Sequence, residues 1–148
     1  MTARSNRPRL LGVDLGTKRI GVAVSDELGL LAHPVGVIAS KGLEADVAAL
    51  IAALDEAGAA AFVVGLPLNA DGSRGKAALA AERFAKRLEE ASGRRVVLWD
   101  ERLSSDAAYD ALMSHDVTHS KRRKRVDVMA ARVILQDYLD HGPGAGGP

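Results

Sequence analysis

Apolar positions at the start of the chain alternate with polar ones or form short runs, which is the pattern of β-strands. Residues 9–15 and 20–25 form two such runs, joined by the short turn 16–19, and the spacing predicts a hairpin. Residues 30–39 form a third run that contains Pro34. Because proline cannot donate a ladder hydrogen bond, this strand is expected at an edge of the sheet.

Helical and strand spacing then alternate along the rest of the chain. Apolar residues at Leu43, Val47, Leu50, Ile51 and Leu54 predict a helix that ends at Gly58, and Ala77, Ala81, Phe84, Ala85 and Leu88 predict another that ends at Gly93. Strands are expected at 61–66 and 96–99, a short helix capped by Ser104 or Ser105, and a last helix from about 126 to 140. This order predicts an α/β fold with a mixed five-stranded sheet, an antiparallel meander followed by parallel strands, flanked by helices.

The 148 residues amount to one domain, expected at 9–141 between a disordered N-terminus (1–8) and a disordered Gly/Pro tail (142–148). The chain has no cysteine, which excludes disulfides, thiolate zinc sites and a thiol nucleophile. Its polar, basic start is not a signal peptide, and no apolar run is long enough for a membrane span. A cytoplasmic protein is expected. The formal net charge of only +1 excludes a protein that coats nucleic acid with a surface that is basic throughout.

Three acids stand out against this pattern. Asp14 lies inside an apolar strand, Glu101 follows another, and Asp127 opens the last predicted helix. Each has a plain structural alternative: Asp14 could cap the following turn, Glu101 could pair with Arg102, and Asp127 could favour a helix start. Yet Asp127 heads a helical stripe with Ala131, Ile134 and Tyr138, so it is expected to point towards the sheet. We favour a shared site.

Carboxylates that converge repel one another unless cations lie between them. Oxygen ligands select hard ions, so Asp14, Glu101 and Asp127 are predicted to bind Mg²⁺ or Mn²⁺ and to be the catalytic residues. Two such ions, about 4 Å apart, would support an in-line displacement at phosphorus without a protein nucleophile.

A basic run stands two residues before Asp127 and consists of Lys121, Arg122, Arg123, Lys124 and Arg125. Such a run is usually a solvated surface loop. Next to a hydrolytic centre, however, the charges would neutralise phosphates, and we favour binding of a nucleic-acid backbone. Aromatic residues make up only 3% of the chain, so base stacking is expected to contribute little.

Two further motifs invite comparison with known sites. The turn 65–75 precedes a helix, where Arg74 and the helix amides could face a phosphate, although Ala70 and Ala77 break the P-loop pattern. His115 and His119 have the spacing of a zinc helix, but the stretch is predicted to leave a helix and enter the basic loop, so exposed histidines are the better interpretation.

Four ordered motifs, 12–23, 65–69, 100–105, and 126–136 with Ala130 and Ala131, resemble the YqgF family, also called RuvX, over about residues 9–139. The resemblance implies an RNase H-like fold and a metal-dependent nuclease of the bacterial cytoplasm, most often assigned to 5′-end maturation of pre-16S rRNA. It places the acidic triad on Asp14, Glu101 and Asp127. Further motif residues are expected at the substrate: Thr17, Lys18, Arg19, Asn69, Arg102 and Ser104.

One position departs from the related RuvC-type resolvases, which place a further aspartate where this chain has Ala130. The sequence therefore supports the cleavage of Holliday junctions less strongly than it supports phosphodiester hydrolysis in general. The leading hypothesis is a nuclease for structured RNA that could also act on branched or single-stranded DNA. The alternatives are a Holliday junction resolvase, a non-catalytic rRNA-binding assembly factor, and an actin-like or sugar-kinase-type ATP-binding protein. The RNA or DNA preference, endonuclease or exonuclease action, and monomer or homodimer state stay open.

Overall fold

A computed structural model describes residues 8–101 and 119–142, with side chains from residue 128 onwards in the last helix. This description leaves out residues 1–7 of the predicted N-terminus (1–8), the predicted short helix after Ser104, and residues 143–148 of the predicted tail. Arg102, Ser104 and His115 are also outside it. Gly142, which was assigned to the tail, is instead buried, and its N–H donates a 2.7 Å hydrogen bond to the carbonyl of Tyr138.

Five strands form one sheet in the order β3-β2-β1-β4-β5. They are β1 (Arg9–Leu15), β2 (Arg19–Ser25), β3 (Ala32–Ala39), β4 (Ala59–Leu66) and β5 (Val96–Asp100). The pairs β1–β2 and β2–β3 are antiparallel, whereas β1–β4 and β4–β5 are parallel. The predicted mixed sheet is confirmed, because short turns can join only antiparallel neighbours and the helical crossovers make the later strands parallel.

The strand with the proline lies at the sheet edge, as predicted. Pro34 pairs with Ala23, and the register shifts beside that pair, so that Val35 lacks a partner and 56% of it is exposed. A proline and a bulge at an edge both hinder pairing with a further strand.

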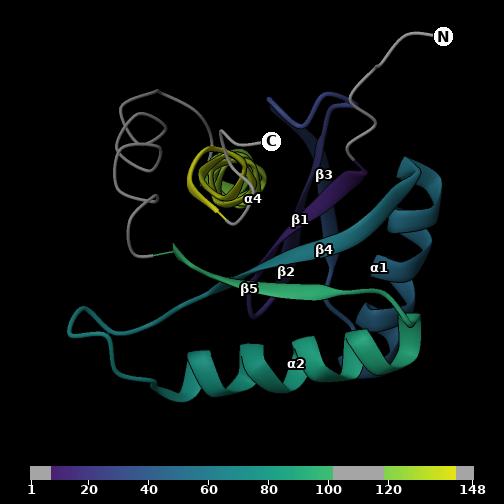
Figure 1. Ribbon diagram of the computed structural model, residues 1–148. Helices are drawn as coiled ribbons and strands as arrows, with labels where there is room; N and C mark the ends of the chain where they lie inside the picture. Colours follow the sequence, from purple (N-terminus) through teal and green to yellow (C-terminus); the bar gives the residue numbers. More distant parts are fainter. Residues whose placement is uncertain (1–7, 102–118, 143–148) are drawn as a thin grey trace, which may run out of the picture.

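Helices cover both faces of the sheet (Figure 1). The helices α1 (Leu43–Ala57) and α2 (Lys76–Ser92) lie on one face, and α4 (His119–His141) crosses the other. The two glycines predicted to end α1 and α2 do so: Gly58 and Gly93 have φ of 66° and 67°, a left-handed conformation that a side chain would strain.

The two faces have separate apolar cores. Leu11, Val13 and Val64 pack with α1 and α2 residues such as Leu50 and Leu88. On the other face, α4 packs against the sheet through a second cluster, which consists of Ala23, Ala32, Val63, Ala131, Ile134, Leu135 and Tyr138. Neighbouring residues of one strand therefore pack in opposite cores, because successive side chains of a strand point to opposite faces of the sheet.

The start of the last helix differs from the prediction. The helix begins at His119 instead of near residue 126, so the basic run from Lys121 to Arg125 is helical and not a loop. Lysine and arginine are strong helix formers, and neither glycine nor proline interrupts residues 119–141. Asp127 consequently lies in the third turn, which removes the helix-start explanation for this acid.

Within the described ranges, no helix combines the length and the apolar character needed to cross a membrane.

Candidate active site

The carboxyl ends of the three parallel strands meet at one edge of the sheet. In the ladder, Val13 of β1 pairs with Val64 of β4, and Gly65 of β4 pairs with Trp99 of β5. Asp14 is the last residue but one of β1, and Glu101 directly follows β5. Strand β4, with Gly65 near its end, therefore lies between Asp14 and Glu101 in the sheet.

The two acids lie on the face covered by α4. An added Cβ at Gly12 would come within 2.7 Å of Leu135 Cβ and 3.1 Å of the Ala131 carbonyl oxygen, so this side of β1 faces the helix. Asp14 lies two residues further along and shares that face. An added Cβ at Gly65 would overlap Oε2 of Glu101, which places the second carboxylate over the middle strand.

Charge coupling shows that the structure brings these acids together. The pKa of Glu101 is raised from its ordinary value of 4.5 to about 7, mainly by burial and in smaller part by the negative charges of Asp14 and Asp100. Asp14 itself is half-buried. Because like charges in a partly dehydrated site disfavour ionisation, the pair provides an environment in which a bound cation would be strongly favoured.

The helix that carries the third acid is firmly attached to the sheet. Ala131, Ile134 and Tyr138 are buried, so the predicted stripe faces the sheet. Asp127 lies one turn before Ala131, about 6 Å along the helix axis, and its side chain is outside the description. Among the side chains that are described, no three of His, Asp or Glu form a group able to hold a metal ion.

Polar contacts on two sides of α4 hold the helix against the sheet. Trp99 Nε1 donates a 2.6 Å hydrogen bond to Asp137 Oδ2, and the Trp99 ring meets that of Tyr138 edge to face at 5.3 Å. On the opposite side, the Gln136 amide accepts from the Ala32 N–H (2.9 Å) and donates to the Leu30 carbonyl (2.8 Å). Gln136 falls within the last of the four family motifs, and its position in the sequence alone predicts no role for it.

The loop after β4 is ordered by its own side chains. Asn69 Nδ2 donates to Ser73 Oγ at 2.9 Å, and Ser73 also donates to Asp71. Arg74 is paired with Glu82 of α2 at 3.2 Å. For Asn69 and Arg74, the structure thus shows contacts within the protein, which a phosphate would have to share or replace.

Three further predicted substrate residues, Thr17, Lys18 and Arg19, lie in the turn between β1 and β2 or at the first position of β2. The Gly16 N–H donates to the Arg19 carbonyl at 2.9 Å, and the Lys18 carbonyl accepts from Ser40. The Thr17 and Lys18 side chains are exposed. Thr17 also borders a cavity of about 380 Å³, which the sequence pattern does not predict.

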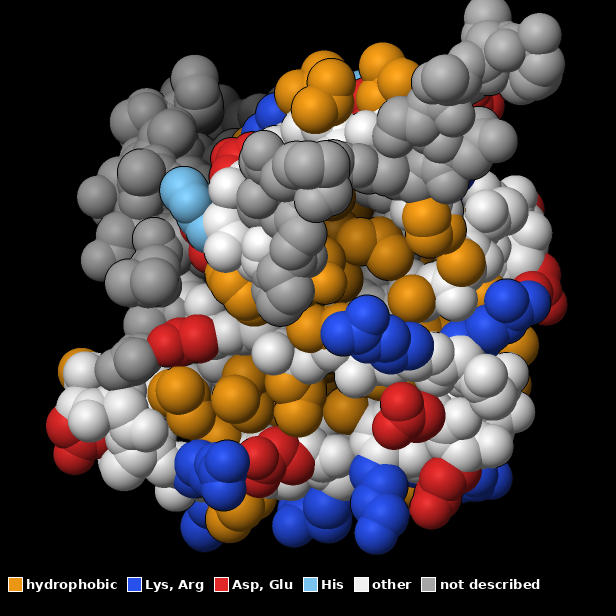
Figure 2. All heavy atoms as spheres, viewed as in Figure 1, with side chains coloured by type: hydrophobic (Ala, Val, Ile, Leu, Met, Phe, Trp, Pro, Cys, Tyr) orange, Lys and Arg blue, Asp and Glu red, His pale blue; other side chains and the backbone are white. Residues whose placement is uncertain are grey.

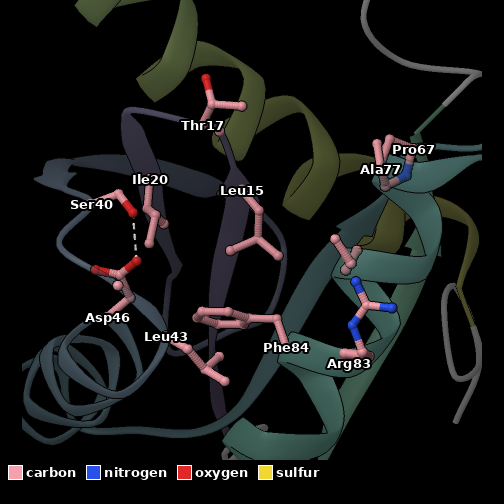
Figure 3. A pocket seen from close by; sticks show the side chains of 14 residues that line it. Leu15, Thr17, Ile20, Ser40, Leu43, Asp46, Pro67, Ala77, Arg83 and Phe84 are labelled. Atoms are coloured by element: carbon pink, nitrogen blue, oxygen red, sulfur yellow. Dashed lines mark hydrogen bonds between the residues drawn. The ribbon is translucent and has the colours of Figure 1, made fainter.

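This cavity opens on the opposite face of the sheet from the two acids, between the starts of α1 and α2 (Figure 3). Leu15, Ile20 and Phe84 form apolar walls, and the buried Asp46 accepts a 2.6 Å hydrogen bond from Ser40. Leu15 points into the cavity while Asp14, its neighbour, lies on the α4 side, so the cavity and the acids are distinct features of the same strand end.

Known proteins resemble this chain in sequence and in fold. A family model described as "RuvX: Holliday junction resolvase" matches residues 8–141. A "Putative pre-16S rRNA nuclease" of Geobacillus kaustophilus (strain HTA426) is 53% identical over 134 residues, which cover 89% of this chain and 97% of the relative. A protein of the same name from Myxococcus xanthus (strain DK1622) is 48% identical over 136 residues, which cover 91% of this chain and 90% of the relative.

Two solved structures share the fold at low identity. RuvC of Thermus thermophilus in complex with a Holliday junction substrate has a TM-score of 0.55 at 14% identity and covers 86% of this chain and 92% of its own. The fowlpox virus Holliday junction resolvase has a TM-score of 0.53 at 14% identity and covers 89% of this chain and 97% of its own.

Proposed function

Because the chain belongs to the RuvX family, we propose that it is a Mg²⁺- or Mn²⁺-dependent nuclease that hydrolyses phosphodiester bonds in the 5′-end maturation of pre-16S rRNA. The substrate assignment is supported by the names of relatives that are 48–53% identical over nearly their whole length. A role in the cytoplasm, where ribosomal RNA precursors are made in bacteria, is part of the same proposal.

The proximity of Asp14 and Glu101 is the observation that carries the catalytic part. Two acids that are far apart in sequence lie at one sheet edge, close enough for Asp14 to raise the pKa of Glu101. A second carboxylate near Glu101 raises the free-energy cost of ionising both acids, and a cation bound between them would lower that cost. The pair therefore supports a cation site.

The residues fit a hard divalent ion. The donors are carboxylate oxygens, and the missing side chain at Gly65 leaves a cradle over β4 that the Glu101 carboxylate occupies. Asp14 and Glu101, together with Asp127 from α4, would hold the ions. When bound, Mg²⁺ or Mn²⁺ supplies a water nucleophile and stabilises the leaving oxygen of the phosphodiester.

The protein's own contribution is to position these groups and to bind the nucleic-acid backbone. The sheet fixes Asp14 and Gly65, and the attached α4 sets the place of Asp127. The five basic residues from Lys121 to Arg125 occupy the preceding turns of that helix and would bind backbone phosphates. Thr17, Lys18, Arg19, Asn69, Arg74, Arg102 and Ser104 remain proposed substrate residues.

A substrate panel tests the proposal. Wild-type protein with Mn²⁺ should cleave precursor rRNA, and Asp14→Asn should abolish cleavage while RNA affinity changes little. Asp55→Asn, the same change at an exposed position of α1, is the matched control and should cleave like the wild type. Undiminished cleavage by Asp14→Asn would rule out the catalytic assignment.

Holliday junction resolution is the second candidate, because the family model carries that description. Adding a four-way junction and single-stranded DNA to the panel separates these activities. A non-catalytic rRNA-binding role would instead leave rRNA maturation in cells intact with Asp14→Asn and would require only the basic segment. Calorimetry with ATP tests the remaining alternative, an ATP-binding protein.

A further inference from the structure

Gly65 occupies a crowded position at the end of β4. The residue is buried, and an added Cβ would overlap Oε2 of Glu101 and lie 2.7 Å from Ile134 Cδ1. The Glu101 carboxyl carbon would be 3.4 Å away. The Glu101 carboxylate and the Ile134 side chain therefore occupy the space that a side chain at position 65 would fill.

The atoms that contact this position belong to the ends of side chains. Both Oε2 of Glu101 and Cδ1 of Ile134 can move by rotation about side-chain bonds, so an alanine at 65 can be accommodated without a shift of the backbone. At Gly12 the situation is different, because the atoms in contact are Leu135 Cβ and the Ala131 carbonyl oxygen. A Cβ atom and a backbone oxygen cannot move without the helix itself, so the absence of a side chain at Gly12 allows α4 to lie this close to the sheet.

We propose that Gly65 is a positioning residue for metal binding: its missing side chain lets the Glu101 carboxylate lie across β4 towards Asp14. This inference rests on the proposed function, since it concerns the same acids. A methyl group at 65 would displace the carboxylate from the strand and so separate the two acids. Gly65 itself touches neither the metal nor the substrate in this account.

Gly65→Ala tests the proposal through Mn²⁺ binding, measured from the electron paramagnetic resonance signal of free Mn²⁺. We expect the variant to stay folded and to bind Mn²⁺ at least about tenfold more weakly, the size of effect seen when the support of a metal ligand is removed. Cleavage should need correspondingly more Mn²⁺ and recover at saturating metal. Unchanged Mn²⁺ affinity would overturn the proposal.

A double-mutant cycle with Glu101→Asp identifies the contact responsible. The aspartate is one methylene shorter, so its carboxylate no longer reaches the added methyl group. Glu101→Asp alone should weaken Mn²⁺ binding, and Gly65→Ala should then have little further effect in that background. If the two losses multiply instead, the alanine acts by another route and the positioning role is wrong.

Two control variants separate positioning from folding. Gly36→Ala makes the same change in the edge strand β3, where an added Cβ meets no atom within 4 Å but the φ of 158° strains a side chain. This variant should lose stability and still bind Mn²⁺ like the wild type, which would show that destabilisation alone does not weaken metal binding. Gly65→Ala with Ile134→Val removes the Cδ1 that the alanine would crowd and should keep the tenfold loss, because the overlap with Glu101 persists. Restored affinity in this double variant would overturn the proposal.

The outcomes distinguish this inference from the function on which it rests. Wild-type protein that neither binds Mn²⁺ nor cleaves the substrate panel contradicts the proposed nuclease and, with it, the role of Gly65. Wild-type binding and cleavage together with unaffected Gly65→Ala contradict the positioning role alone.

Discussion

Trp99 donates a 2.6 Å hydrogen bond from its indole nitrogen to Asp137, and this contact joins the edge strand β5 to α4. Glu101 lies two residues after Trp99, and Asp127 lies on the helix that Asp137 anchors. The bond thus ties together the two elements that carry the second and third acids. Its partners are partly buried, and only 17% of the Asp137 side chain is exposed.

Trp99→Phe should lower the free energy of unfolding by about 1–3 kcal/mol, because a shielded carboxylate loses a donor while most of the ring packing is kept. Denaturant unfolding measures the change. His141→Gln serves as the control: His141 lies 3.9 Å from the same carboxylate but is 70% exposed, so its loss should cost less than about 0.5 kcal/mol. If the two variants lowered the free energy of unfolding equally, the indole hydrogen bond would contribute no more to stability than the exposed His141 contact.

Gln136→Leu should also cost about 1–3 kcal/mol, because the N–H of Ala32, a residue that is only 2% exposed, and the Leu30 carbonyl lose their partner. Asp140→Asn is the control, because Asp140 accepts a 3.1 Å hydrogen bond from the Gln136 amide but is exposed, so water can replace this contact. Hydrogen exchange should locate the loosened amides in the β2–β3 hairpin. Protection unchanged at Ala32 would refute the role assigned to Gln136.

Glu101→Gln should change the pH dependence of stability in metal-free protein. The pKa of Glu101 is raised from 4.5 to about 7 in the folded state, so the native protein binds a proton more tightly than the unfolded chain. The stability that this proton contributes is complete below pH 4.5 and is lost as the pH rises through 7. Allowing for partial exposure of Glu101, the free energy of unfolding of the wild type should fall by about 2 kcal/mol more than that of the variant as the pH rises through this range.

Thermal unfolding in EDTA at pH 4.5 and pH 8 provides the measurement. The wild type and Glu101→Gln should differ in unfolding temperature only at the higher pH. At that pH, added Mn²⁺ should stabilise the wild type more than the variant. Parallel stability curves across this range would mean that the folded state does not hold the proton on Glu101.

Neutralising Lys121, Arg122 and Arg123 to glutamine should weaken RNA binding and reduce the slope of log affinity against log salt by about 2, because three phosphate contacts are lost. The control neutralises Lys76, Arg83 and Lys86 of α2, which removes the same charge. Basic and acidic side chains are mixed along α2 in Figure 2, so this surface should contribute little to RNA binding. Equal slopes in both variants would argue against a role specific to α4.

Much of the fold could be predicted because local patterns and global packing agree. The period of two in β1 reflects two cores, so that Leu11 and Val13 face α1 and α2 while Gly12 faces α4. Pro34 marked the edge strand, and Gly58 and Gly93 marked helix ends, each through a backbone property that no distant contact has to supply.

Features that depend on distant contacts could not be predicted. The charge of the basic run predicts a loop, whereas helix propensity and the anchored C-terminal half of α4 extend the helix back to His119. Gly65 looked like a turn residue, and only the fold places Glu101 and Ile134 against it. The cavity beside Leu15 likewise forms from four segments that are separate in the sequence.

The central claim is that Asp14, Glu101 and Asp127 share one site for hard divalent ions. The most direct test is the anomalous difference map of crystals soaked in Mn²⁺. We predict a manganese peak within coordination distance of all three carboxylates, about 2.0–2.5 Å from their oxygens, which disappears in Asp14→Asn. A map in which manganese is absent from Asp14 and Glu101, or in which Asp127 lies far from the ion, would contradict the account.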